Sequence, residues 1–74
     1  MKDGVNVAQE HIEELRKARS ALVNARRNWA KVLAGSYQRG KSDQAITEIA
    51  NVQHAIDAID RAIIDEGDLF TKGQ

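Results

Sequence analysis

Two histidine–carboxylate pairs are the first residues of this sequence whose types and spacing suit chemistry. His11 precedes Glu14 by three residues and His54 precedes Asp57 by three, so each pair occupies one turn of a helix. Helical-bundle di-iron proteins use Glu-x-x-His from two helices with further glutamates, but the order is reversed here. We therefore expect no metal site, and we expect His11 to face the helix–helix seam near Glu66.

The serines offer no better catalytic centre. Ser20, Ser36 and Ser42 have no histidine at triad geometry, because the two-helix hairpin predicted below provides no concave scaffold. We expect no catalytic residue, no cofactor and no enzymatic activity.

A glycine-rich stretch, Gly35–Ser42, fits G-x-x-x-x-G-K-[ST] at every position. It resembles the Walker A motif of P-loop NTPases, whose backbone N–H groups cradle phosphates. That motif follows a buried strand in a parallel sheet, whereas Gly35 follows a long heptad pattern, and 74 residues cannot build such a domain. We interpret Gly35 as a left-handed helix stop and Ser42 as a helix N-cap. An anion held by Arg39 and Lys41 at the following helix N-terminus stays open.

Basic residues gather in the first half of the chain. Residues 1–41 carry nine Lys/Arg and four Asp/Glu, and residues 42–74 carry two and seven, giving net charges of +5 and −5. Either the basic part contacts nucleic acid, as in small helical-hairpin dimers of similar architecture that bind RNA, or it lies against the acidic part and is neutralised. The candidate anion or nucleic-acid contacts are Arg26, Arg27, Lys31, Arg39 and Lys41.

The composition bounds the class of protein. The 74 residues are 42% hydrophobic and 30% charged, with no proline, no cysteine and three aromatic residues, which predicts one small all-α domain without disulfides. No apolar run approaches the ~18 residues of a membrane span, and the N-terminus has no secretory signal. We expect a cytoplasmic protein.

Heptad spacing predicts two helices. The first should cover about 6–34, capped by Asn6, with a loop at 35–42; the second should cover about 43–66, ended by Gly67, with a short tail at 67–74. In the first helix an apolar residue recurs every seventh position, at Ala8, Leu15, Leu22 and Trp29. In the second, spacings of four and three alternate through Ala45, Ile49, Val52, Ile56, Ile59 and Ile63. Because the loop is short, we expect an antiparallel hairpin.

The apolar arcs are wider than one seam requires. Ile46 and Ile64 lie well to one side of Ile56 on a helical wheel, as Val23 and Ala30 do relative to Leu22. We therefore expect a homodimer that forms a four-helix bundle, in which Ala18, Ala21 and Ala25 permit close helix approach. The predicted core and dimer residues are Leu15, Leu22, Trp29, Ile46, Ile49, Val52, Ile56, Ile59, Ile63 and Ile64.

Polar residues inside the arcs suggest a register. If residue i lies opposite roughly 77 − i, Arg19 falls near Asp60 and Arg26 near Gln53. We hypothesise that the Arg19–Asp60 ion pair sets the alignment, within a hairpin or across a dimer. Tyr37 is expected to pack on Trp29 or Leu33, and Leu69 and Phe70 to fold back onto the bundle end or mark a partner site.

The expected function is protein interaction without catalysis: a self-associating scaffold or regulatory module, with a protein partner of unknown identity left open. The alternative is a small RNA-binding hairpin dimer. Secreted hairpins of the WXG type are similar in architecture, but their Trp-x-Gly turn is missing, because Trp29 stands six residues before Gly35.

Overall fold

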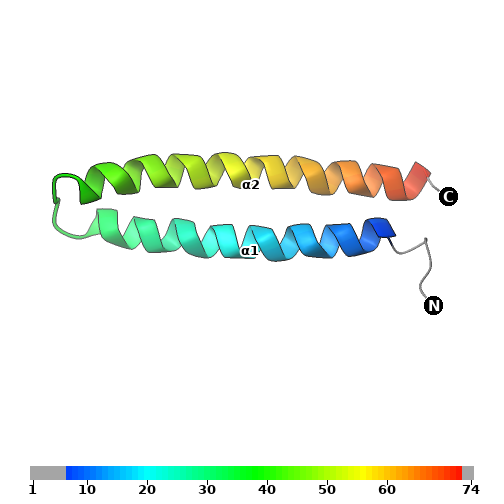
Figure 1. Ribbon diagram of the computed structural model, residues 1–74, viewed down its shortest axis with the longest axis horizontal. Helices are drawn as coiled ribbons and strands as arrows, with labels where there is room; N and C mark the ends of the chain where they lie inside the picture. The colour runs from blue at the N-terminus through cyan, green and yellow to red at the C-terminus, as the bar shows by residue number, and fades with distance from the viewer. Residues whose placement is uncertain (1–6, 73–74) are drawn as a thin grey trace.

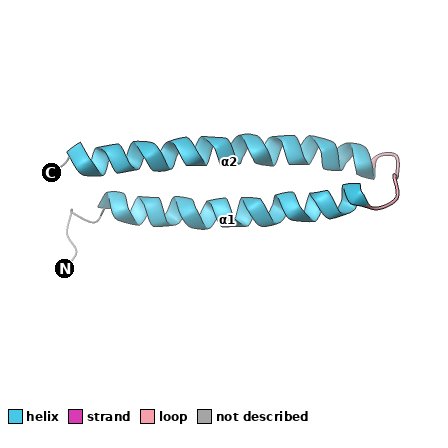
Figure 2. Cartoon of the chain, turned by 180° about the vertical axis from the view of Figure 1, so that it is seen from behind, coloured by secondary structure: helices cyan, strands magenta, loops and turns pink. Residues whose placement is uncertain are grey.

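The computed structural model of this chain is an antiparallel pair of helices joined by a short loop. It describes residues 7–72, with side chains over 7–69. Helix α1 covers Val7–Ala34 and helix α2 covers Lys41–Lys72. The two lie side by side along their length (Figure 1), and the view from behind shows the same pairing (Figure 2). The predicted all-α hairpin is confirmed, and the molecule is elongated, at 53 × 20 × 13 Å.

Helix α2 is longer at its C-terminal end than the sequence predicts. It continues through Gly67, Leu69 and Phe70 to Lys72, so the predicted helix stop at Gly67 and the tail folding back are both wrong. A glycine ends a helix by adopting a left-handed conformation, and among the described residues only Gly40 has a positive φ, of 90°. The extension runs alongside α1 as far as the first described turn of that helix (Figure 1).

The loop is shorter than predicted because α2 begins at Lys41. The Gly40 carbonyl accepts the Gln44 N–H at 2.8 Å, so Gly40 takes the N-cap position expected for Ser42. Ser42 is buried instead, and its Oγ accepts the Gln38 N–H at 2.9 Å. Gly35 has no positive φ, so it is not the left-handed stop that was predicted; its N–H donates to the Val32 carbonyl at 3.3 Å.

The helix register differs from the prediction by two residues. Arg19 contacts Asp60 and Arg26 contacts Gln53, so both contacts place residue i opposite 79 − i. This register sets Val7, the start of α1, level with Lys72, the end of α2, which explains why α2 passes Gly67. Within the described residues, no helix combines the length and the apolar character needed to cross a membrane.

Candidate functional site

The seam between the helices buries little. We use seam for the apolar side chains along the line where α1 meets α2. Among the described residues, the buried apolar side chains are Ala45, Val52 and Ile56, all on α2. Helix α1 has no buried residue at all: Leu15, Leu22 and Trp29 are half-buried. Ile49, Ile59 and Ile63 are half-buried too, whereas Ile46 and Ile64 are 55% and 63% exposed.

One side of the seam is crossed by two polar contacts. Arg19 Nε donates to Asp60 Oδ1 at 2.6 Å and its Nη2 to Oδ2 at 3.3 Å, a bidentate ion pair between half-exposed side chains. One heptad toward the loop, Arg26 Nη1 donates to Gln53 Oε1 at 2.9 Å. The sequence-derived pairs are thus in contact. We call this side the bridged flank.

The ion pair has an electrostatic signature. The hydrogen bond from Arg19 lowers the pKa of the Asp60 carboxyl, and its positive charge acts in the same direction against partial desolvation. In return, the hydrogen bond to Asp60 and its negative charge raise the pKa of the Arg19 guanidinium. Both ions are therefore favoured by the fold.

Apolar side chains accompany the bridges on this flank. Val23 follows Arg19 by four residues and Ile64 follows Asp60 by four, so each shares a helix face with its bridge residue. Ile46 precedes Gln53 by seven. The exposed arcs inferred from the sequence therefore lie on one flank, with polar side chains between them.

The opposite side of the seam has small side chains. On a helical wheel, Ala18 and Arg19 fall on opposite sides of Leu22, and Ala55 and Asp60 on opposite sides of Ile56. Five residues at helical spacing form this side, which we call the alanine flank: Ala18, Ala21, Ala25, Ala55 and Ala62. At one end, Ala18 and Ala62 line a shallow groove with Leu15.

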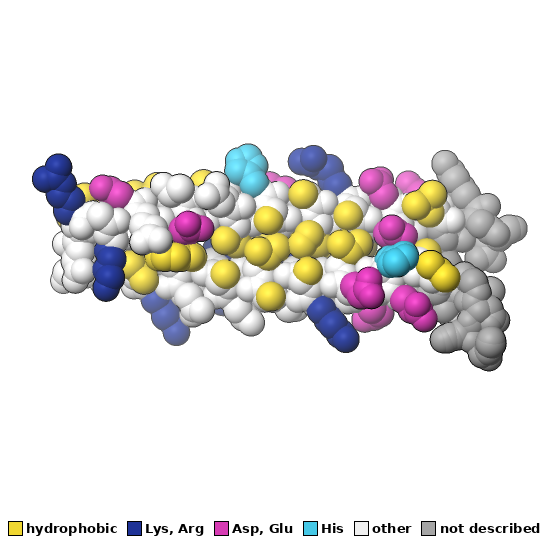
Figure 3. All heavy atoms as spheres, in the orientation of Figure 1, with side chains coloured by type: hydrophobic (Ala, Val, Ile, Leu, Met, Phe, Trp, Pro, Cys, Tyr) yellow, Lys and Arg dark blue, Asp and Glu magenta, His cyan; other side chains and the backbone are white. Residues whose placement is uncertain are grey.

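No hydrogen bond or ion pair between described residues crosses the alanine flank at these positions. On a helical wheel, Ala18 and Ala25 fall on the side of Leu22 opposite to Arg19 and Arg26. Figure 3 shows a strip of hydrophobic side chains along the groove between the helices, with charged side chains at its edges and ends. The seam is therefore open to solvent on this side.

The histidines do not assemble a metal site. His11 lines the same groove as Glu66, as predicted, and its Nδ1 lies 3.4 Å from Glu14 Oε1, with both of these side chains exposed. His54 is exposed on α2. Within residues 7–69, no group of three or more His, Cys, Asp or Glu side chains is placed to hold a metal ion.

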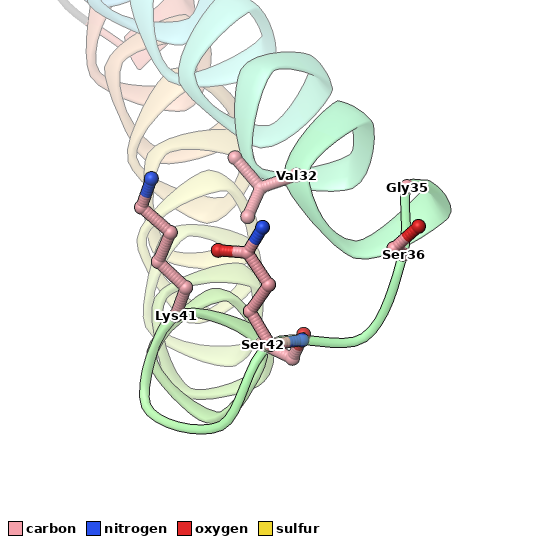
Figure 4. Close-up of a pocket in the computed structure, with 6 residues that line it drawn as sticks. Val32, Gly35, Ser36, Lys41 and Ser42 are labelled. Carbon is pink, nitrogen blue, oxygen red and sulfur yellow. The ribbon is translucent and has the colours of Figure 1, made fainter.

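The glycine-rich stretch joins two helices, with no strand before it in the described chain. A small pocket there is lined by Val32, Gly35, Ser36, Gln38, Lys41 and Ser42. In Figure 4, Lys41 extends from the start of α2 and Ser36 lies just after the end of α1, and both belong to the lining of this pocket. The predicted packing of Tyr37 on Trp29 or Leu33 is wrong: Tyr37 is 67% exposed and its hydroxyl donates to Asp43 Oδ1 at 3.4 Å.

The basic residues are mostly unpaired. Arg16 lies 3.5 Å from Glu13 on its own helix, and only Arg19 forms an ion pair across the hairpin within the described chain. Five others in the basic half of the chain are exposed and form no ion pair with another described residue: Lys17, Arg27, Lys31, Arg39 and Lys41. The acidic half of the chain thus neutralises the basic half through a single direct contact among these residues.

Comparison with known protein families, with curated proteins and with solved structures gives no match to this chain. The function proposed below therefore rests on the geometry of the hairpin.

Proposed function

We propose that this protein is a self-associating interaction module without catalytic activity, and that two copies form a four-helix bundle. The observation that carries the proposal is that α1, over its 28 residues, has no fully buried side chain, and its seam residues Leu15, Leu22 and Trp29 stay partly exposed. A helix of this length is stable in a protein chiefly through the packing of its apolar face.

The exposed area supports the same proposal. A compact monomer of 8.2 kDa has about 4,500 Å² of accessible surface, whereas this chain has 5437 Å². A second copy can cover the half-buried seam residues that α2 alone leaves partly exposed to solvent.

The absence of catalysis belongs to the proposal as well. The histidines and Ser42 lie apart: His11, which contacts Glu14, and His54 are exposed on different helices, and the Ser42 Oγ accepts the Gln38 N–H within the loop. Nucleophilic catalysis needs a nucleophile and a base within hydrogen-bond reach of each other.

The test is the molar mass in solution. Sedimentation equilibrium between about 1 and 300 µM should give twice the 8.2 kDa chain mass, with helix content by circular dichroism falling as the complex dissociates. A folded particle of 8.2 kDa across this range would overturn the proposal.

Nucleic-acid binding is a second candidate, favoured by the five exposed basic side chains without an ion pair. Lys17, Arg27 and Lys31 share α1, and Arg39 lies in the loop. A gel shift with RNA at about 50 mM salt, weakening steeply by 200 mM, would support phosphate contacts. Arg27→Ala with Lys31→Ala should then weaken the shift, and Arg61→Ala, at an exposed basic residue of α2, is the control; no shift at low salt would remove this candidate.

A further inference from the structure

We infer that the second copy docks on the alanine flank, head to tail, so that the two loops lie at opposite ends of the bundle. This inference rests on the proposed self-association and adds to it the face and the orientation.

The face follows from what each flank would bury. Docking on the bridged flank would desolvate the half-exposed Arg19 and Asp60, whose charges are already paired with each other. The alanine flank presents methyl groups and the open seam behind them (Figure 3). Small side chains let two helix backbones approach closely, so that half-buried seam residues such as Leu22 and Ile59 come into contact across the interface.

The flank is centred on the middle of the hairpin. Ala18 and Ala25 bracket the midpoint of α1, and Ala62 and Ala55 bracket the same level of α2, since residue i lies opposite about 79 − i. A two-fold axis through this level brings alanine against alanine whether α1 of one copy meets α1 or α2 of the other. The alanines therefore fix the position of the axis and leave the orientation to other side chains.

Charge along the hairpin decides the orientation. The half next to the loop, residues 21–56, has five Lys/Arg and two Asp/Glu, a net charge of +3. The other half, residues 7–20 and 57–72, has five Lys/Arg and eight Asp/Glu, a net charge of −3. If both loops lay at one end, the acidic halves would face each other, as would the basic halves. Head-to-tail docking places each acidic half over a basic half.

Charge also differs across the hairpin, since residues 1–41 carry a net charge of +5 and residues 42–74 one of −5. Loops at one end would set the basic α1 over the acidic α2 of the other copy. These charges lie on neighbouring helices about 10 Å apart, whereas the +3 and −3 halves are separated along a molecule 53 Å long. The longer separation outweighs the smaller charges, so the larger dipole runs along the hairpin, and side-by-side dipoles align antiparallel.

Spin-label distances test the orientation, because the chain has no cysteine of its own. A nitroxide on Gln38→Cys, at the loop, should give an inter-copy distance close to the length of the hairpin. A Gln38→Cys distance under about 25 Å, the width of a bundle plus two labels, would mean loops at one end and would overturn the inference. Ser20→Cys, at mid-hairpin, is the control and should give a shorter distance in either orientation.

Two matched alanines of α1 test the face. Ala21 lies on the alanine flank and Ala30 on the bridged flank, and both are exposed in the single hairpin, so Ala→Glu should cost either position little in folding. Ala21→Glu should raise the dissociation constant of the dimer about 100-fold, because a charge would be buried, while Ala30→Glu should change it less than about 3-fold. Equal effects, no effect, or a larger effect at Ala30 would overturn the assigned face.

Failure of the inference is distinguishable from failure of the proposed function. If Ser20→Cys shows no inter-copy coupling and the mass stays at 8.2 kDa, self-association itself is wrong. If the mass is that of two chains but the distances or the glutamate pair disagree, only the face or orientation is wrong.

Discussion

The two flanks of the hairpin differ although they border the same seam. The bridged flank closes over the seam with long polar side chains: Arg19 reaches Asp60 and Arg26 reaches Gln53. The alanine side chains of the other flank are too short to cross, so the seam is exposed between them. Polar pairs within an apolar arc can therefore cover one side of a small core. The other side of the core is then the one available for association with a second chain.

The bridges also fix the register that the seam alone leaves loose. Heptad seams in two helices can slide by whole repeats, because each repeat offers the same apolar surface. Two polar contacts one heptad apart, both on i opposite 79 − i, select a single alignment. The polar contacts of the bridged flank thus fix the register of the two helices, whereas the alanine flank is a surface available for contact with a second chain.

Truncating a buried side chain of the seam, which both flanks border, should have the largest effect on stability. Ile56 is 1% exposed, so Ile56→Ala should lower the free energy of unfolding by about 3 kcal/mol, through lost transfer energy and a cavity. Ile64→Ala, at 63% exposure, is the control and should cost under about 1 kcal/mol. Urea denaturation at fixed protein concentration measures both, and comparable losses would show that Ile64 is packed against another chain.

Removing the bridges should erase the difference between the flanks. With Arg19→Leu and Asp60→Leu together, the bridged flank becomes apolar, and burial of a second face is no longer opposed by paired charges. We expect assemblies larger than two chains, seen by sedimentation velocity. A double variant with the mass distribution of the wild type would indicate that the bridges do not direct association.

Breaking the ion pair from one side should destabilise the hairpin. Asp60→Ala leaves Arg19 without its bidentate partner, whereas Asp57→Ala removes only a 3.1 Å contact from Gln53 Nε2 to an exposed carboxylate. The thermal midpoint should fall further for Asp60→Ala than for Asp57→Ala. Equal small shifts would remove the role of Arg19–Asp60 in alignment.

The same pair predicts a pH dependence of stability. The pKa of Asp60 is lower in the folded chain than in the unfolded chain, where an aspartate titrates near 3.9, so the unfolded state takes up protons first. The stabilisation from Asp60 is complete above about pH 4 and is lost as pH falls through the folded-state pKa. Thermal melts from pH 7 to pH 2.5 should show a loss that is smaller in Asp60→Asn; identical pH profiles would contradict it.

Replacing Gly67 by alanine should have the smallest effect on stability, and the effect should be stabilising. It lies within α2, and a Cβ built there meets nothing within 4 Å. Gly67→Ala should raise the free energy of unfolding by about 0.5–1 kcal/mol, because alanine loses less backbone entropy in a helix. A destabilised variant in urea denaturation would mean that Gly67 is not helical in solution.

Periodicity predicted the architecture and the polar pairs. Heptads specify two amphipathic helices, and the short loop makes them antiparallel, as observed. Arg19 with Asp60 and Arg26 with Gln53 followed from their places in the apolar arcs. The two-residue error in register was too small to separate the pairs, because long side chains reach across such a shift.

The ends of the elements could not be predicted from local signals. Glycine often ends a helix and serine often caps a helix N-terminus, but Gly67 and Ser42 do not take these roles here. The continuation of α2 depends on α1 lying alongside it, which is a contact between residues about 60 positions apart. The side-chain role of Ser42 depends on the path of the loop, which brings the Gln38 N–H to its Oγ.

The alanine flank, too, could be predicted from the sequence only in part. The alanines of α1 suggested close helix approach from the sequence alone, and α2 supplied Ala55 and Ala62 at heptad spacing. Their meeting on one side, with the bridges on the other, required knowing which way each helix faces its neighbour.

Two apolar stripes, their course along each helix and the charges within them follow from the order of residues alone, because helical periodicity acts over a few residues. The packing of α1 against α2 sets how far α2 extends, which glycine adopts a left-handed conformation and which side of the seam stays open. These depend on contacts between distant parts of the chain, whose free energy no local pattern contains.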